Sequence, residues 1–351
     1  MTIVYAILMF SVLVFVHELG HFMAAKLSGV QVNEFALFMG PAIWKKQIGE
    51  TLYSLRCIPF GGYCAMEGED QETESPRSFQ KAAWWKRLII LAAGVIMNFL
   101  MGLLLYALLA LPKDTVMVPQ IESFEPCCIF NREDGLQAGD TILEIDGETV
   151  YIYSDVNLLL GLNPSGIHDF VVQRGEETLR FEDMQMGHTH LNEKGEEYIH
   201  YGFTYAQEKQ ATFGMKLGYV WNSVMDDVRN VRLSLQMLFG GRAELSSVTG
   251  PVGIVVQVSD VASQADSWIQ MLQIFAAIGA FLSVNLAVMN LLPIPALDGG
   301  RIVALLLTTA IEKITRKKID PKYEGYIHGV GMILLLGLMA IIMFKDVWNL
   351  F

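Results

Sequence analysis

Four stretches of the sequence are almost entirely apolar and long enough to cross a membrane as helices. They are the N-terminal run that begins at Ile3 and residues 88–111, 268–292 and 326–344. A helix needs about 20 apolar residues to span the hydrocarbon core, and open sheet is excluded there because lipid cannot satisfy backbone polar groups. The composition agrees, since 52% of the residues are hydrophobic and 18% are charged, against about a quarter charged in soluble domains. We therefore expect a polytopic α-helical membrane protein with four transmembrane helices.

A cluster of ionisable residues lies at the end of the first apolar run. His17, Glu18 and His21 form the sequence His-Glu-Leu-Gly-His directly after Val16. Residues four apart share one face of a helix, so the two imidazoles can bind one metal ion while Glu18 activates a water molecule. The same pattern also occurs on soluble helices without a metal. Ionisable groups within an apolar segment persist mostly where they pair, bind an ion or face water, which favours a metal site here.

Two histidines leave a catalytic zinc site incomplete, because such a site usually has three protein ligands and one position for water. The best candidate for the third ligand is Asp298, within the sequence that runs from Asn290 to Gly300. Prolines in this sequence break regular helix and its paired glycines allow unusual dihedral angles, so we expect Asp298 on irregular backbone at membrane depth. Such backbone is tolerated there only when it is buried in protein or faces water. The alternative is a simple end of a span with a solvated Asp298.

The basic residues predict the sidedness of the chain. Eight Lys and Arg residues lie between the first two spans, and six lie between the last two: Lys26, Lys45, Lys46, Arg56, Arg77, Lys81, Lys86 and Arg87, then Arg301, Lys313, Arg316, Lys317, Lys318 and Lys322. The positive-inside rule makes both segments cytoplasmic, so both termini and residues 112–267 are expected outside. No basic residue precedes the first span, which therefore does not resemble a cleaved signal peptide.

The segments outside the spans show β-sheet patterns. Residues 32–66 are rich in β-formers and are interrupted at Gly40-Pro41, Gly49 and 59–63, which indicates hairpins. An edge of that sheet could pair with an extended substrate, although an ordinary structural hairpin explains the pattern equally well. Residues 115–205 contain short alternating runs with turns at Asp146-Gly147 and Arg174-Gly175, so we expect a small β-rich domain.

Residues 215–238 have apolar side chains at helical spacing, but a group of charged residues near the middle makes them a poor span: Asp226, Asp227, Arg229 and Arg232. An amphipathic helix on the membrane surface or against the β-rich domain is expected. The net charge of −12 is explained by solvated acidic segments, and the sequence has no basic patch with interleaved aromatics, so nucleic-acid binding is not expected. Cys127 and Cys128 are adjacent and expected outside, and the sequence does not reveal their redox state.

Together these features resemble the intramembrane site-two-type zinc metalloproteases of the RseP group. The His17–His21 and Asn290–Gly300 motifs match the two signatures of that family in order and position, and the likeness extends through residues 59–63 and 250–254. Residues 135–147 resemble a PDZ domain. The chain departs from the family at Phe38-Met39-Gly40, where Gly-Phe-Gly is common, and at Gly94-Val95, where a proline often follows the glycine.

The resemblance implies that His17, His21 and Asp298 bind Zn²⁺ and that Glu18 is the catalytic base. Eight further residues are candidates for substrate binding: Asn98, Asn290, Pro59, Phe60, Gly61, Gly62, Pro293 and Pro295. For the two asparagines, a hydrogen bond between helices is an equally good explanation. The implied substrates are single-span membrane proteins, such as anti-sigma factors after a first cut or signal-peptide remnants, and the PDZ-like domain would filter them by size or bind a carboxyl terminus.

The expected organisation is a first span with His-Glu-x-x-His (1–27), a cytoplasmic-side β-hairpin region and linker (28–87), a second span (88–111), an extracytoplasmic PDZ-like domain (112–206), an amphipathic helical connector (207–267), a third span with the Asp298 motif (268–300), a cytoplasmic loop (301–325) and a fourth span (326–344). The resemblance implies the inner membrane of a bacterium. The alternative is a catalytically silent PDZ-containing membrane adaptor, against which the intact Glu18 argues.

Overall fold

The computed structural model describes residues 2–69, 73–125, 135–163, 165–185, 188–191, 197–241, 265–316 and 322–348, together with residues 250, 253, 254, 256, 258 and 261. The chain divides into two compact units, which we call the helical unit (Met1–Leu105 and Asn230–Phe351) and the β-rich unit (Tyr106–Arg229). Several residues discussed above lie outside the described ranges: Cys127, Cys128, Pro251, Val252, Lys317 and Lys318.

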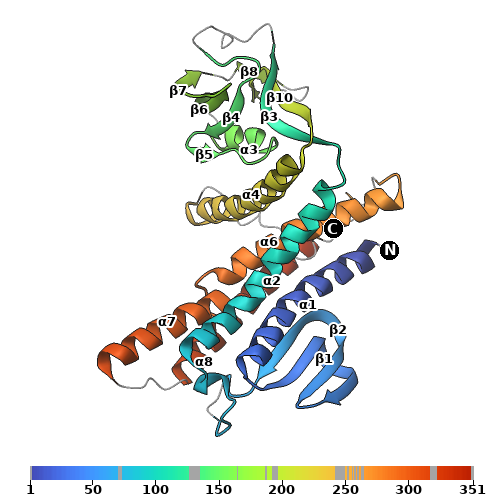
Figure 1. Cartoon of the computed structure of the whole chain (residues 1–351), viewed down its shortest axis with the longest axis vertical. Helices are drawn as coiled ribbons and strands as arrows, with labels where there is room; N and C mark the ends of the chain where they lie inside the picture. The colour runs from blue at the N-terminus through green and yellow to red at the C-terminus, as the bar shows by residue number, and fades with distance from the viewer. Residues whose placement is uncertain are drawn as a thin grey trace. The chain divides into compact units, whose positions relative to one another are not determined.

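Four described helices are long and apolar enough to cross a membrane (Figure 1). They are α1 (Thr2–Ser28), α2 (Trp84–Ala110), α6 (Trp268–Leu291) and α8 (Lys322–Trp348), with candidate spans Ile7–Ser28, Trp84–Ala110, Trp268–Leu291 and Gly325–Asp346. All four carry exposed large apolar side chains, such as Leu8, Leu104, Leu272 and Ile333. Apolar surface of this extent needs a lipid environment rather than water. The prediction of a polytopic membrane protein is confirmed.

Small residues allow α1, α2 and α6 to pack closely. A Cβ atom added at Gly20 of α1 would lie 2.8 Å from the backbone carbon of Ala93 on α2, and one added at Gly102 of α2 would lie 2.5 Å from Val284 Cγ2 on α6. Ser283 of α6 donates a 2.8 Å hydrogen bond to the carbonyl of Asn98. Close backbone approach at small residues and interhelical hydrogen bonds are the usual basis of helix association in lipid.

The backbone around Asp298 differs from the prediction. Helix α6 ends at Leu291, and the prolines at 293 and 295 lie in the non-helical segment 292–297, which we call the connector. Asp298 is the first residue of helix α7 (Asp298–Thr315), so it lies on regular backbone, and much of the expected loop 301–325 is helical. Gly299 and Gly300 are also helical, and a Cβ at either would overlap the backbone of Leu291 or Ile294. These glycines permit close contact and do not adopt unusual dihedral angles.

The segment between α1 and α2 forms one long, bent hairpin, and the short helix η1 (Phe79–Lys81) follows it. Strands β1 (Val32–Ile48) and β2 (Thr51–Met66) reverse direction at residues 49–50. Residues 34–37 of β1 pair on one side with residues 62–65 and on the other with residues 52–55. This double pairing requires both strands to bend, and Phe38, Gly40 and Gly61 accordingly have positive φ angles. Gly40-Pro41 and residues 59–63 are therefore bends within strands and not the expected turns.

The β-rich unit is built on a six-stranded sheet. Its main strand order is β10-β3-β4-β6-β7, and β5 pairs with β4. The strands are β3 (Thr115–Phe124), β4 (Thr141–Ile145), β5 (Glu148–Thr149), β6 (Ile167–Arg174), β7 (Glu177–Gln185) and β10 (Phe203–Gln210), and β8 (His188–Leu191) pairs separately with β9 (Glu197–His200). Ile142, Ile145 and Phe170 are fully buried. Asp146 and Gly147 both have positive φ at the two-residue β4–β5 turn, as a type I′ hairpin turn requires.

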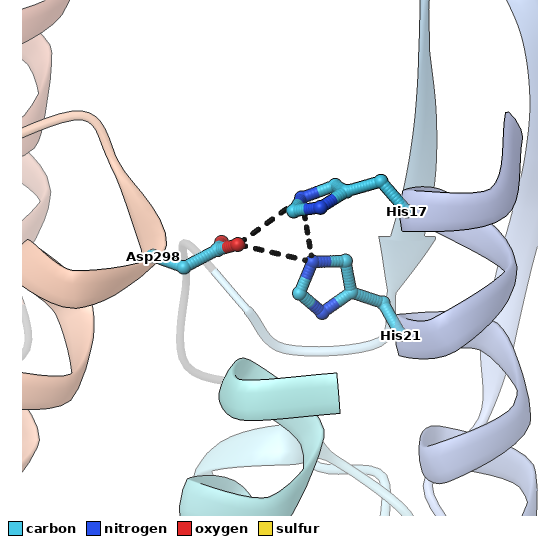
Figure 2. Close-up of side chains that lie close together, drawn as sticks. All are labelled: His17, His21 and Asp298. Carbon is cyan, nitrogen blue, oxygen red and sulfur yellow. Dashed lines mark hydrogen bonds and ion pairs between the residues drawn. The ribbon is translucent and has the colours of Figure 1, made fainter. Parts of the chain in front are cut away.

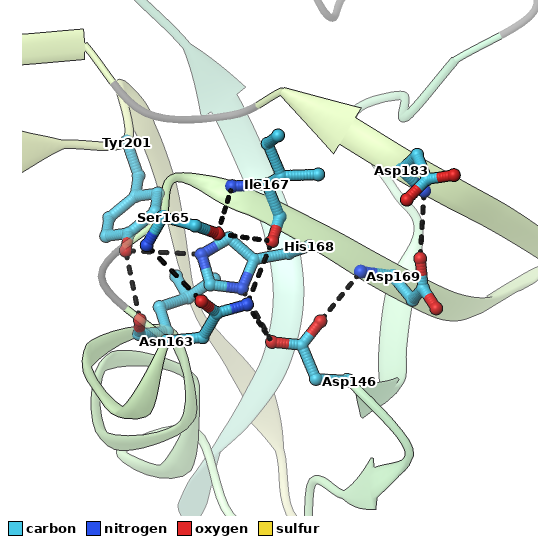
Figure 3. Close-up of polar contacts among 9 residues, drawn as sticks. Asp146, Asn163, Ser165, Ile167, His168, Asp169, Asp183 and Tyr201 are labelled. Atoms are coloured by element: carbon cyan, nitrogen blue, oxygen red, sulfur yellow. Dashed lines mark hydrogen bonds and ion pairs between the residues drawn. The ribbon is translucent and has the colours of Figure 1, made fainter.

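Two polar networks brace this unit. In the first, buried His168 of β6 contacts the Asp146 carboxylate through Nδ1 at 2.8 Å, and Nε2 lies 3.3 Å from the Tyr201 hydroxyl (Figure 3). In the second, Arg229 of helix α4 (Phe213–Phe239) lies 3.0 Å from Asp155 at the start of helix α3 (Asp155–Leu162). The residues 213–229 of α4 thus pack against the β-rich unit, which was one of the two predicted locations.

Candidate metal centre

His17, His21 and Asp298 converge on one point (Figure 2). Asp298 Oδ2 lies 3.1 Å from His17 Nε2 and 3.3 Å from His21 Nε2, and the two Nε2 atoms are 3.2 Å apart. The histidines come from α1 and the aspartate comes from α7. More than half of the chain separates these two helices in the sequence. The structure thus brings together the three residues that the sequence proposed as ligands, and among the described residues they form the only group with this arrangement.

The Nδ1 atom of each imidazole contacts a group on helix α2. His21 Nδ1 lies 2.8 Å from the carbonyl oxygen of Ile90, which can only accept, so Nδ1 carries the proton and Nε2 presents its lone pair. His17 Nδ1 lies 3.4 Å from the side-chain amide of Asn98. Rotation of the Asn98 side chain exchanges its amide oxygen and nitrogen, and with the oxygen facing the ring Asn98 accepts a hydrogen bond from Nδ1–H. In that orientation both contacts leave Nε2 free to bind a metal.

The three converging atoms fit a zinc ion. Asp298 Oδ2 is buried and has no hydrogen-bond donor among the described residues, although two imidazole nitrogens lie next to it. Three electron-pair donors in contact repel each other unless a cation lies between them. Ligands at about 2.0–2.1 Å in a tetrahedron are roughly 3.3 Å apart, which matches the observed separations of 3.1, 3.2 and 3.3 Å.

Gly94 also belongs to this site, although it was not among the predicted site residues. A Cβ atom added at Gly94 of α2 would lie 2.7 Å from His17 Cε1 and would overlap His21 Nε2. The absence of a side chain at this position is what lets both rings lie against α2. A glycine four residues before Asn98, on the same face of an apolar helix, was the available signal. The role of the Ile90 carbonyl had no signal in the sequence, because every residue has a backbone carbonyl group.

Glu18 lies beside the bent hairpin. A Cβ atom added at Gly62 would lie 3.5 Å from Glu18 Cγ and 3.1 Å from the carbonyl oxygen of Ala36. Gly62 of β2 therefore lies next to the Glu18 side chain. Within the described chain, no strand pairs along the outer edge of residues 62–65. Glu69, three residues after the end of β2, forms an ion pair with Arg301 of α7. That ion pair joins the hairpin to the helix that carries Asp298.

The remaining candidate substrate-binding residues lie on three different parts of the helical unit. Asn98 is buried against His17 and Ser283, which places it behind the imidazole and favours a supporting role over the predicted contact with substrate. Asn290 is half-buried in the last turn of α6, and Pro293 and Pro295 belong to the connector. Pro59 is exposed in β2, where Phe60 and Gly61 follow it toward Gly62.

Comparisons with known proteins identify the family of the chain. The profile of peptidase family M50 matches residues 5–338. A Clostridium perfringens protein that carries a zinc metalloprotease name is 35% identical over 355 aligned residues, which cover 99% of this chain and 98% of the relative. The regulator of sigma-W protease RasP of Bacillus subtilis is 27% identical over 435 aligned residues, covering 100% and 99%. The zinc metalloprotease RasP of Geobacillus kaustophilus is also 27% identical, over 438 aligned residues that cover 100% and 98%. The chain therefore belongs to peptidase family M50 and is a membrane-embedded zinc metalloprotease of the site-two-protease type.

Proposed function

We propose that the protein hydrolyses a peptide bond within or near the transmembrane segment of single-span membrane proteins. The observation that carries this proposal is the location of the ligands, because His17 and His21 lie inside the candidate span Ile7–Ser28. A hydrolytic centre at membrane depth acts on chains that are themselves in the membrane. The zinc ligands in this proposal are His17, His21 and Asp298, and Glu18 is the catalytic base.

His17, His21 and Asp298 would hold the zinc ion, which would supply a Lewis acid to polarise the scissile carbonyl and lower the pKa of water. Glu18 then removes a proton from the attacking water and delivers it to the leaving amine. The Ile90 carbonyl fixes the tautomer and orientation of His21, and Asn98 does the same for His17. Such outer hydrogen bonds keep the two rings aligned while the charge at the centre changes.

The bent hairpin supplies a place for the substrate backbone. A transmembrane helix satisfies its own hydrogen bonds, so a substrate must unwind before water can attack it. We propose that the unwound segment pairs with the outer edge of residues 62–65, where Gly62 lies next to the Glu18 side chain. Pro59, Phe60, Gly61 and Gly62 would shape that edge, and Asn290, Pro293 and Pro295 would contact the opposite side of the substrate.

Single-span proteins already shortened by an earlier cut are the proposed substrates, with anti-sigma factors first and signal-peptide remnants second. The name of the Bacillus subtilis relative refers to regulation of sigma-W, which supports the first class. In the proposed orientation, residues 28–87 and 301–325 are cytoplasmic in a bacterial inner membrane, and both termini and residues 112–206 are outside. We propose a PDZ-like role for the β-rich unit, as a size filter or as a binder of carboxyl termini.

Glu18→Gln tests the assignment. The full-length protein is reconstituted in liposomes with a single-span reporter whose outer domain is truncated. The variant should retain zinc and lose about 10²–10⁴-fold in cleavage rate, since general base catalysis contributes that much. Cleavage at the original rate would refute hydrolysis by this centre, and absence of cleavage by the unchanged protein as well as the variant would favour the silent adaptor. Cleavage of an intact reporter as fast as the truncated one would remove the size-filter role.

A further inference from the structure

The connector determines where the Asp298 carboxylate lies. It joins α6 to α7 over six residues, and Ala296, two residues before Asp298, has a φ angle of 84°. A non-glycine residue in this left-handed region is disfavoured and persists only where surrounding contacts hold it. The local contacts of the connector are short-range, from Ile294 N to Leu292 O and from Leu297 N to Ile294 O. The contact that holds Ala296 itself comes from a different helix.

His328 of α8 makes that contact. The backbone N–H of Ala296 donates a 3.0 Å hydrogen bond to His328 Nδ1. One turn along the same face of α8, a Cβ added at Gly331 would lie 2.8 Å from the backbone carbonyl carbon and oxygen of Pro295. Helix α8 therefore touches the connector through a histidine that accepts a hydrogen bond and a glycine that allows close approach.

The surroundings of His328 make this contact specific. Its neighbours in α8 are exposed apolar side chains: Ile327 is 58% exposed and Val330 is 60% exposed, as expected for a helix surrounded by lipid. A polar side chain in such a segment is costly and is retained mostly where it makes a defined interaction. Because Nδ1 accepts from an N–H group, the ring proton is on Nε2, and the imidazole acts here as a neutral acceptor.

We propose that His328 is a positioning residue for the zinc site. It holds the left-handed turn at Ala296 and thereby directs the Asp298 carboxylate toward the two imidazoles of α1. The inference rests on the proposed function, since it requires Asp298 to be a zinc ligand. It also gives α8 a role in the site, although none of the three ligands is on that helix.

Two substitutions separate the hydrogen bond from the bulk of the ring. His328→Asn keeps an acceptor on Cγ, at the same distance along the side chain as Nδ1, whereas His328→Leu has similar size and no acceptor. Zinc affinity is measured on the purified full-length protein in detergent by competition with a chelating indicator. Loss of a hydrogen bond that orients a ligand typically weakens metal binding about 10–100-fold. We expect that loss in His328→Leu and near-normal affinity in His328→Asn, with kcat for reporter cleavage following zinc affinity and KM unchanged.

A second pair of variants tests the same contact if His328→Leu does not fold. Gly331→Ala should push against Pro295 and weaken zinc binding, whereas Gly329→Ala adds a methyl group with no atom within 4 Å and should not. Normal zinc affinity in both His328→Leu and Gly331→Ala would overturn the proposal, and so would equal weakening by the asparagine and leucine variants. Asp298→Asn is the control for the ligand set. If it binds zinc normally, the proposed function fails; if it alone loses zinc, only the role of His328 fails.

Discussion

Replacing Gly94 by alanine tests whether the packing of α2 against the two imidazoles determines zinc binding. The new methyl group would lie 2.7 Å from His17 Cε1 and 2.9 Å from His17 Nδ1, and it would overlap His21 Nε2. Carbon atoms in contact are normally about 3.5–4.0 Å apart, so the rings must move by roughly 1 Å. His21 cannot move freely, because its Nδ1 is bonded to the carbonyl of Ile90 on the same helix.

A displacement of this size at a reacting centre typically costs on the order of 10²-fold in rate. We therefore expect Gly94→Ala to lose about 10²-fold in kcat/KM and to bind substantially less than one zinc per chain. Zinc content is measured by elemental analysis after gel filtration, and cleavage is measured with a truncated single-span reporter in liposomes. The helix itself should be favoured by alanine, by about 1 kcal/mol. A gain in helix stability with a loss of metal would distinguish this effect from unfolding.

Gly102→Ala is the matched control in the same helix. Its methyl group would meet Val284 Cγ2 at 2.5 Å and would be remote from both histidines, so it disturbs α2–α6 packing without displacing a ligand. We expect reduced thermal stability with full zinc content. If Gly94→Ala retains one zinc and normal cleavage, or if Gly102→Ala loses zinc to the same extent, the reasoning from ring displacement is refuted.

Three further outcomes are expected. Asn98→Leu should weaken zinc binding about 10–100-fold and Asn98→Asp should not, because a carboxylate can still accept a hydrogen bond from His17 Nδ1–H; equal losses in a chelator titration would contradict this role. Removing zinc with a chelator should abolish cleavage and adding zinc should restore it, whereas cleavage by verified metal-free protein would exclude the mechanism. Burial and the Asp155 carboxyl raise the pKa of Asp226 well above its usual value. The pKa of Asp226 is raised to about 8 in the folded state, so between about pH 4 and that value the folded state binds more protons than the unfolded state. Thermal stability should therefore fall as pH rises through this window, and Asp226→Asn should flatten that slope; an unchanged slope would contradict the assignment.

The fold and the centre were predictable to different extents. Long apolar runs predicted the four spans because in lipid the helix is the element that satisfies its own backbone. His17, His21 and Asp298 were recognisable because ligand chemistry restricts residue type and spacing. The bends of β1 and β2 were not predictable as such, since glycine and proline signal a change of direction and do not say whether the strand continues after it. The sheet pairs residues 34–37 on both sides, and that long-range pairing keeps the strands continuous through the bends.

Asp298 shows the same limit at the level of one residue. The prolines and glycines around Asp298 indicated irregular backbone, but the irregular part ends at residue 297. Gly299 and Gly300 instead allow close packing against the end of α6. Both uses of glycine follow from its missing side chain, and the sequence does not separate them. The supporting groups were harder still to predict. The Ile90 carbonyl has no sequence signal, and His328 acquires its role from a contact with Ala296 that only the folded chain provides.

The centre links helices that are distant in sequence, so a metal ion held there would contribute to their assembly. The α1 histidines depend on α2 through Ile90, Gly94 and Asn98, and Asp298 depends on the connector and α8. An ion bound by both groups stabilises the arrangement that brings them together by RT ln(1 + [L]/Kd), or about 2.7 kcal/mol at a free concentration 100 times Kd. Without the ion, the electron pairs of three donor atoms about 3 Å apart oppose the same arrangement. Zinc binding and the docking of α7 against α1 are consequently one equilibrium, so that substitutions in α2, the connector and α8 should change metal affinity and helix packing together.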